Sequence, residues 1–320
     1  MYFSIIIPVY NRPQEIGELL TSLLEQTYRN FEVLVIEDGS TITCEKQIDH
    51  FMGSLSLRYF YIENCGQGFA RNYGMEHANG EYFVLFDSDC LIPPQYLEVL
   101  NAAIAERKLD AHGGPDAAGE DFSFFQKAIN YSMTSFLTTG GIRGKLKDLS
   151  KYQARGYNMG LSRDAFIATK GFVDPNRAED IELSMRLKKM GFRLELVPAA
   201  FVYHKRKNTW GSFLKQSFSF GQNRVNVSRF HADAIKAVHL MPVGFLLGWI
   251  MALLLWWTGY GLSLYLFQLY ALWLLLVFVD ASIQNRSALV GFLSLFTSFG
   301  QLSAYGWGLL SEWIKKQIKG

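Results

Sequence analysis

The chain has 320 residues, of which 49% are hydrophobic, and a formal net charge of only +2. That length allows two domains or one domain with an appendage, and the small net charge excludes the global basic field of a nucleic-acid-binding protein. The three cysteines, Cys44, Cys65 and Cys90, form no CxxC pair, which favours a reducing compartment and argues against a zinc site.

The N-terminal segment shows a strand, helix, strand pattern. Phe3–Val9 and Phe31–Ile36 are apolar runs rich in β-forming residues. Pro13 between them suits the first turn of a helix, whose apolar residues follow the spacing of one helix face: Ile16, Leu19, Leu20, Leu23 and Leu24. This order predicts a βαβ unit with parallel strands and a right-handed crossover. Because a strand begins so near the start of the sequence, no signal peptide is expected.

Carboxylates follow two of the predicted strands. Asp38 ends the second strand, and Asp87-Ser88-Asp89 ends the unbroken apolar run Tyr82–Phe86, which is typical of a strand buried on both faces. In extended backbone Asp87 and Asp89 would face one way and Ser88 the other. Open α/β sheets bind ligands at this edge, and two carboxylates there suit Mg²⁺ or Mn²⁺. A polar turn is an equally good interpretation of the tripeptide alone.

A third strand, Leu57–Ile62, is followed by Gly66-Gln67-Gly68, which opens the next helix. Glycines allow close backbone approach, and a helix N-terminus favours an anion, although a plain turn explains the pair as well.

Four motifs, taken in the order in which they occur along the chain, resemble those of a known protein family: Ser4–Asn11, Asp38-Gly39-Ser40, Gly68–Asn72 and Phe86–Asp89. Together they resemble the family 2 glycosyltransferases, which have the GT-A fold, over about Tyr2–Tyr203. The resemblance implies a nucleotide-diphosphate sugar donor, a divalent metal and inversion at the anomeric carbon.

The resemblance also implies roles for single residues. The nucleobase would be contacted by Pro8, Val9, Tyr10 and Asp38. Arg71 would lie beside the nucleotide, and Asp87 near the ribose or base. Asp89 would bind the metal, and Ser88 is counted with the substrate-binding residues.

Two later segments extend the resemblance. Gly156–Phe166, which includes Asn158, would border the donor sugar. Glu179 and Asp180 open a helix, and the family places its catalytic carboxylate at Asp180, with Glu179 among the substrate-binding residues. Taken alone, Asp180 would more simply be a helix cap. His204 could be a further metal or phosphate ligand, although a single His is more often structural.

The middle of the chain has weaker signals. Pro94–Ala105 and Phe122–Thr139 suit helices, and Ala111–Pro115 suits a short strand and turn. Gly140–Tyr152 suits either a loop that closes over the substrates or an ordinary surface loop. Leu194–Phe201 is predicted to be the last strand.

The C-terminal third changes character. Seven basic residues lie between Lys205 and Lys236, interleaved with aromatic residues, which suggests an interfacial helix on anionic lipid or a solvated helix of the enzyme domain. Leu240–Tyr260 and Leu262–Val279 are long enough to span a bilayer, whereas Ala288–Leu310 is more polar and could span, re-enter or lie flat. The Gln-x-x-Arg-Trp signature of processive family members is incomplete, because Val225 follows Arg224.

These observations predict an α/β protein with a GT-A catalytic domain (1–204), a basic aromatic juxtamembrane segment (205–239) and hydrophobic membrane helices (240–320). The expected activity is metal-dependent inverting sugar transfer from a nucleotide-diphosphate sugar, with a UDP-sugar favoured, to a glycan or lipid-linked acceptor. It would take place at the inner membrane, with the catalytic domain in the cytoplasm and no nucleic-acid partner. A sugar-phosphate nucleotidyltransferase and a catalytically silent membrane scaffold are the alternatives.

Overall fold

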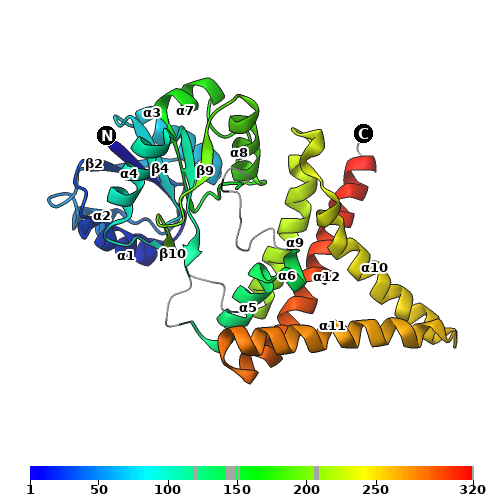
Figure 1. Ribbon diagram of the computed structural model, residues 1–320. Coiled ribbons are helices and arrows are strands. Elements are labelled where there is room, and N and C mark those ends of the chain that lie inside the picture. Colours follow the sequence, from blue (N-terminus) through cyan, green and yellow to red (C-terminus); the bar gives the residue numbers. More distant parts are fainter. Residues whose placement is uncertain (118–121, 141–148, 150–151, 205–208, 319–320) are drawn as a thin grey trace. The chain divides into compact units, whose positions relative to one another are not determined.

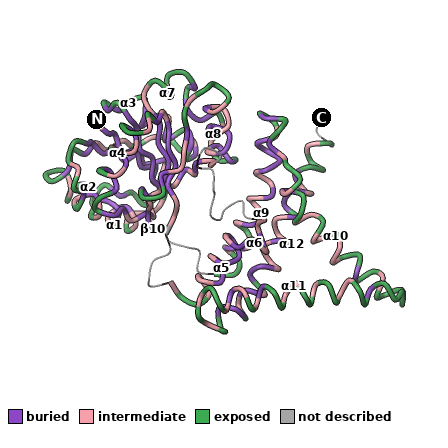
Figure 2. Tube along the Cα trace, viewed as in Figure 1, coloured by how far each residue is buried: buried purple, intermediate pink, exposed green. Residues whose placement is uncertain are grey.

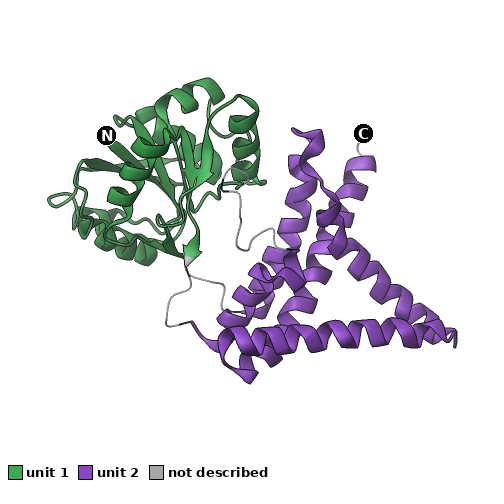
Figure 3. Ribbon diagram, viewed as in Figure 1, with its two compact units in different colours: residues 1–119, 147–205 green, residues 120–146, 206–320 purple. Residues whose placement is uncertain are grey.

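The computed structural model describes residues 1–117, 122–140, 149, 152–204 and 209–318. The chain forms two compact units (Figure 3). Unit 1 comprises residues 1–119 and 147–205, and unit 2 comprises residues 120–146 and 206–320. The expected catalytic domain, 1–204, counted residues 122–140 with the sheet, whereas the structure groups them with the C-terminal helices in unit 2.

Unit 1 is built on a seven-stranded sheet (Figure 1). Across the sheet the strands are β3 (Leu57–Ile62), β2 (Phe31–Asp38), β1 (Phe3–Val9), β4 (Tyr82–Phe86), β8 (Asn158–Ser162), β6 (Ala111–Gly113) and β9 (Leu194–Leu196). Only β8 runs antiparallel to its neighbours, β4 and β6, while the other pairs are parallel. The prediction of a mostly parallel α/β sheet is confirmed.

The central strands are buried throughout and mostly apolar because helices cover both faces of the sheet. Every residue of β1, β2 and β4 is buried. In β1, Ile5 and Ile7 face one core and Ile6 faces the other. The first core includes helices α1 (Pro13–Leu24) and α4 (Tyr96–Arg107), and the second includes α3 (Gln67–His77), α7 (Arg163–Thr169) and α8 (Glu179–Lys189). A short helix, α2 (Glu45–Asp49), follows β2.

A second, three-stranded sheet lies in unit 1. Its order is β5 (Cys90–Leu91), β10 (Val202–His204) and β7 (Asp116–Ala117). The prediction of a single last strand over Leu194–Phe201 is therefore wrong. That segment ends its pairing with β6 at Leu196, a turn follows, and the chain then joins the second sheet at Val202.

Unit 2 is helical. It contains α5 (Phe124–Thr134), α6 (Phe136–Thr139), α9 (Trp210–Val227), a short 3₁₀ turn (Ala232–Ala234), α10 (Ala237–Trp257), α11 (Leu262–Asn285) and α12 (Ala288–Ile318). The helix expected over Phe122–Thr139 is broken at Ser135, which has extended backbone and whose hydroxyl accepts from the amide of Leu137. Most of the expected loop Gly140–Tyr152 lies outside the described residues.

Helix α12 is the centre of unit 2. It packs against α9, α10, α11 and α5. The Ser132 hydroxyl of α5 lies 2.6 Å from that of Thr297 on α12, and Tyr131 donates to Asp280 of α11 at 2.7 Å. In contrast, α10 and α11 leave most of their apolar surface exposed (Figure 2). By length and composition α10, α11 and α12 are each apolar enough to cross a membrane.

Candidate active site

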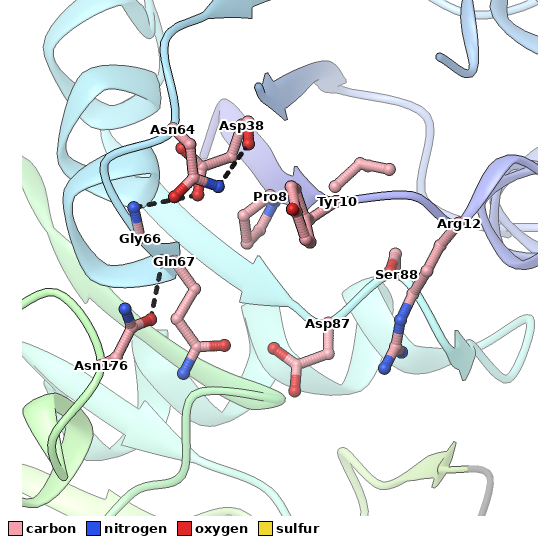
Figure 4. A pocket seen from close by; sticks show the side chains of 11 residues that line it. Pro8, Tyr10, Arg12, Asp38, Asn64, Gly66, Gln67, Asp87, Ser88 and Asn176 are labelled. Carbon is pink, nitrogen blue, oxygen red and sulfur yellow. Dashed lines mark hydrogen bonds between the residues drawn. The ribbon is translucent and has the colours of Figure 1, made fainter. Parts of the chain in front are cut away.

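A cleft of about 390 Å³ opens at the carboxyl ends of β1, β2 and β4 (Figure 4). Its lining residues come from the strand ends, from the start of α3 and from the loop before α8: Pro8, Val9, Tyr10, Arg12, Asp38, Asn64, Gly66, Gln67, Asp87, Ser88 and Asn176. Six of the predicted site residues thus share one cavity: Pro8, Val9, Tyr10, Asp38, Asp87 and Ser88. Among the predicted residues whose side chains the structure describes, five do not line it: Arg71, Asp89, Asn158, Glu179 and Asp180.

Asp38 organises the turn before α3. Its two carboxylate oxygens accept the backbone amides of Cys65 at 2.7 Å and Gly66 at 3.0 Å. Its main-chain carbonyl accepts the side-chain amide of Asn64 at 2.7 Å. The Asp38 side chain is buried, so these backbone contacts satisfy a carboxylate that would otherwise be costly to desolvate. Asp38 therefore shapes the wall of the cleft.

The glycines at the start of α3 approach protein backbone. A Cβ on Gly68 would lie 2.6 Å from the Asp174 carbonyl, and Gly66 has a left-handed φ of +89°. The amides of Gln67 and Gly68 already donate to the Asn176 side chain and the Pro175 carbonyl. These interactions favour the plain-turn interpretation of the glycine pair, because the first amides of α3 have protein partners.

A buried chain of charged groups connects the cleft to α8. The fully buried guanidinium of Arg71 lies 2.5 Å from Asp87 Oδ1 and 3.4 Å from Glu179 Oε1. Gln67 donates to the same Glu179 oxygen at 2.6 Å. Burial, then the charge of Asp180, raises the pKa of Glu179 to about 7, although Arg71 opposes this shift. Arg71 therefore links Asp87, on the wall of the cleft, to Glu179, the first residue of α8.

The strand-end tripeptide does not continue as extended backbone. Strand β4 ends at Phe86, and the amide of Cys90 donates to the Asp87 carbonyl at 3.1 Å, which closes a turn. The prediction that Asp87 and Asp89 face one way is therefore wrong, because strand alternation stops before them. Asp87 contacts Arg71, whereas Asp89 forms an ion pair with Arg12.

Arg12 was not expected in the site. It precedes α1, and its guanidinium donates to Asp89 Oδ2 from a side chain that is 37% exposed. Burial alone would lower the pKa of Arg12, but the charge of Asp89 and the hydrogen bond to it raise it above its usual value. The sequence could have indicated Arg12, because this residue lies in the loop after β1, at the edge of the sheet where the carboxylates were predicted.

Asp180 lies at the second position of α8 and is half-buried. Its Oδ2 accepts the Gly156 amide at 3.2 Å. The preceding Ala178 has a left-handed φ of 57°, a conformation that costs free energy for a residue with a side chain. Asp180 thus keeps solvent access beside a strained helix start, while its neighbour Glu179 is buried.

The side chain of Asn158 is buried and forms its hydrogen bonds with other groups of the protein. Its carbonyl accepts the Tyr96 hydroxyl at 2.6 Å, and its amide donates to the carbonyls of Ala200 and Pro115 at 2.9 and 3.3 Å. It holds the start of β8 behind the cleft, and its contact with substrate stays a prediction. His204 ends β10, and its side chain lies outside the described part of the structure.

Among the described residues, no group of three or more His, Cys, Asp or Glu side chains is placed to hold a metal ion. Asp87 lines the cleft, and Asp89 lies in the same turn, where it pairs with the cation of Arg12. In their chemistry both carboxylates nevertheless fit Mg²⁺ or Mn²⁺, which prefer hard oxygen ligands. Mg²⁺ typically takes one or two protein carboxylates and completes its coordination with substrate phosphates and water. A donor diphosphate would supply the missing ligands.

The comparisons with known proteins identify the class. The sequence model described as "Glycosyl transferase family 2" matches residues 4–169, just over half of the chain. The chain therefore belongs to the family 2 glycosyltransferases, as the sequence motifs indicated.

Individual relatives differ in their sequence identity to this chain and in the share of each chain that the match covers. An uncharacterized glycosyltransferase of Rickettsia conorii is 42% identical over 95 residues, which is 30% of this chain and 16% of that protein. The chain covers only 14–16% of the length of three such Rickettsia relatives. Glycosyltransferase AglE of Haloferax volcanii is 24% identical over 256 residues, 78% of this chain and 81% of AglE.

Two solved structures show the same fold. Mannosyltransferase PcManGT from Pyrobaculum calidifontis, in complex with GDP-Man and Mn²⁺, has a TM-score of 0.63 at 18% identity over 96% of this chain and 86% of that one. Residues 1–349 of Staphylococcus aureus TarS, in complex with UDP-GlcNAc, give 0.52 at 20% identity over 99% of this chain and 92% of that one. The prediction of a GT-A fold is confirmed.

Proposed function

We propose that this protein transfers a sugar, with inversion, from a nucleotide-diphosphate sugar to a hydroxyl of a glycan or lipid-linked acceptor. The observation that carries the proposal is the buried Asp87–Arg71–Glu179 chain, which joins the cleft wall to the helix that presents Asp180. A UDP-sugar is the favoured donor. TarS, which is named a poly(ribitol-phosphate) β-N-acetylglucosaminyltransferase, was crystallised with UDP and UDP-GlcNAc.

In this mechanism the chain's own residues bind and orient the two substrates. Tyr10 is 53% exposed at the cleft edge and offers an aromatic face for the nucleobase. Asp180 accepts the proton of the acceptor hydroxyl as that hydroxyl attacks the anomeric carbon from the side opposite the diphosphate. Asp89, with Asp87 beside it, would hold Mg²⁺ or Mn²⁺, which neutralises the charge that develops on the leaving diphosphate. Holding both substrates in line supplies much of the rate.

Helices α10 and α11 would anchor the enzyme in the cytoplasmic membrane, with unit 1 in the cytoplasm. The exposed apolar surface of these helices supports this arrangement, and so does the basic stretch of α9 and the following loop. Synthesis of a cell-surface glycan or glycolipid is the role that fits a membrane-bound transferase of this family.

A donor screen tests the proposal. The purified protein in detergent is incubated with single nucleotide-sugars and Mg²⁺ or Mn²⁺, and release of nucleoside diphosphate is measured. We expect release from one class of donor, loss of release with excess chelator, and loss with Asp89→Ala, which should still fold because it changes a strand-end turn. Full activity in chelator would contradict the metal role. An α-linked product from an α-linked donor, seen by NMR, would contradict single displacement.

A further inference from the structure

The Arg12–Asp89 ion pair has a role that the proposed transfer reaction leaves unexplained. It joins the carboxylate that we propose as a ligand of the divalent cation to a cation of the chain itself. A divalent cation and a guanidinium repel one another, so both cannot be held closely by one carboxylate without cost. The charge on Arg12 must therefore be accommodated elsewhere whenever a metal occupies Asp89.

The backbone beside Arg12 is anchored, and its side chain, which is 37% exposed, pairs with Asp89. The neighbouring Asn11 has a left-handed φ of 54°, and its Oδ1 accepts the amides of Thr41 and Ile42, both at 2.9 Å. Its own amide donates to the Ser40 hydroxyl at 2.8 Å. Arg12 makes no side-chain cap at the start of α1. Its guanidinium can thus change partners while the loop stays in place.

A second partner for that guanidinium would arrive with the donor. Arg12 lines the cleft, and Figure 4 shows its side chain reaching along it towards Ser88 and Asp87. A diphosphate bound there carries negative charge in the geometry that the planar guanidinium recognises through two parallel hydrogen bonds.

We propose that Arg12 occupies the cation position on Asp89 while the donor is absent, and that it moves to the donor's diphosphate when the divalent cation binds. The inference rests on the proposed metal role of Asp89. It makes Arg12 a positioning residue that weakens metal binding to the empty enzyme and strengthens binding of the metal and nucleotide together. Metal and nucleotide would then bind cooperatively, since each removes a cost that the other would meet.

Binding of Mn²⁺ and UDP to the full-length protein in detergent tests this exchange. Free Mn²⁺ is followed by its EPR signal, first alone and then with UDP. With Arg12→Gln, we expect Mn²⁺ alone to bind about three- to tenfold more tightly than in the wild type, because a competing cation is gone. UDP in the presence of Mn²⁺ should bind about tenfold more weakly, because a charged hydrogen bond to phosphate is lost.

Three further variants make the outcome specific. Arg12→Lys keeps the charge, so its affinity for Mn²⁺ alone should stay near that of the wild type. Arg193→Gln removes an arginine of the same unit that pairs with Glu195 at 2.8 Å and does not line the cleft, so it should change neither affinity. Asp89→Asn should lose Mn²⁺ binding.

The results separate the inference from the function on which it rests. Equal Mn²⁺ affinity in wild type and Arg12→Gln, with weak binding in Asp89→Asn, would overturn the exchange and leave the metal role intact. Undiminished Mn²⁺ binding in Asp89→Asn would overturn both. Thermal unfolding of each variant shows whether it is folded.

Discussion

Two adjacent carboxylates at the start of α8 have different surroundings. Glu179 is buried and accepts hydrogen bonds from Arg71 and Gln67. Asp180 is half-buried and accepts two backbone amides, those of Gly156 and Ile181. Because burial penalises the charged form, the pKa of Glu179 is raised. Asp180 instead keeps the solvent access through which a general base can meet an acceptor hydroxyl.

Replacing Asp180 with Asn should therefore separate catalysis from folding. The Asn side chain keeps the shape and can still accept one of these two amides, but it cannot take a proton. We expect Asp180→Asn to lose about two to four powers of ten in turnover, with donor affinity and melting temperature little changed. Turnover and donor binding measured side by side check this. Undiminished turnover would show that Asp180 only serves the helix start.

The raised pKa of Glu179 predicts a pH dependence of stability. The folded state binds this proton more tightly than the unfolded chain, in which the pKa lies near 4.5. The contribution of Glu179 to the free energy of unfolding is thus fully present below that value and is lost as the pH rises through about 7. Glu179→Gln resembles the protonated form and should remove this loss. Thermal midpoints of the two proteins should diverge between about pH 5 and about pH 8, and parallel curves would contradict the assignment.

At the scale of elements, the backbones of α9 and α12 approach each other closely in unit 2. A Cβ on Gly221 would lie 2.1 Å from the Tyr305 carbonyl, and one on Gly308 would lie 2.1 Å from the Phe218 carbonyl. Contacts advance in the same direction along both helices, so α9 and α12 run parallel. Glycine at these positions permits the approach of two backbones, which larger side chains would prevent.

An alanine at Gly221 should consequently destabilise the helical unit. We expect Gly221→Ala to lower the free energy of unfolding by about 1–3 kcal/mol through overpacking. Gly211→Ala lies in the same helix with nothing within 4 Å, and should be neutral or stabilising by up to about 1 kcal/mol because alanine favours helix. Thermal unfolding in detergent compares the pair. Equal effects would mean that the close approach carries no stability.

At the scale of the molecule, unit 2 has an arrangement that bears on the membrane. Helices α10, α11 and α12 form a triangle in Figure 1. Gly306 of α12 meets Pro242 near the start of α10, and Gly291 near the start of α12 meets Phe278 of α11. The opposite corner is the turn at Gly259, beside Trp257, which is 84% exposed. At about 1.5 Å per residue, α10 and α11 are each long enough to carry this corner across the hydrocarbon core.

This geometry favours a hairpin of two spans with α12 along the interface. The C-terminal part of α12 is tied to the segment before α10, since Glu312 pairs with Arg229 at 2.9 Å and Lys316 donates to Ser228. Those basic side chains should stay on the cytoplasmic side.

Cysteine labelling in intact cells checks this topology. A cysteine at Gly259 should react with an impermeant reagent from outside, and one at Lys315 should react only after the cells are opened. Labelling of Lys315→Cys from outside would show that α12 spans the membrane.

Much of the fold follows from the sequence by itself. Strands buried on both faces are mostly apolar, so Phe3–Val9 and Tyr82–Phe86 were predicted with the bounds that the structure shows. The helix that begins at Pro13 was equally predictable, because the apolar residues of its buried face recur every three to four positions. The four motifs identified the family, and the carboxyl edge of the sheet placed most of the residues that line the cleft.

Only the tertiary structure decided which groups these residues contact. It paired Asp89 with Arg12, connected Asp87 to Glu179 through Arg71, and showed that residues 87–90 turn. It also joined α5 and α6 to the C-terminal helices. The physical reason is that the spacing of apolar residues in a sequence reflects two things, the burial of each residue and the local conformation of the backbone. The partner of a polar side chain depends instead on distant segments that meet only when the chain folds.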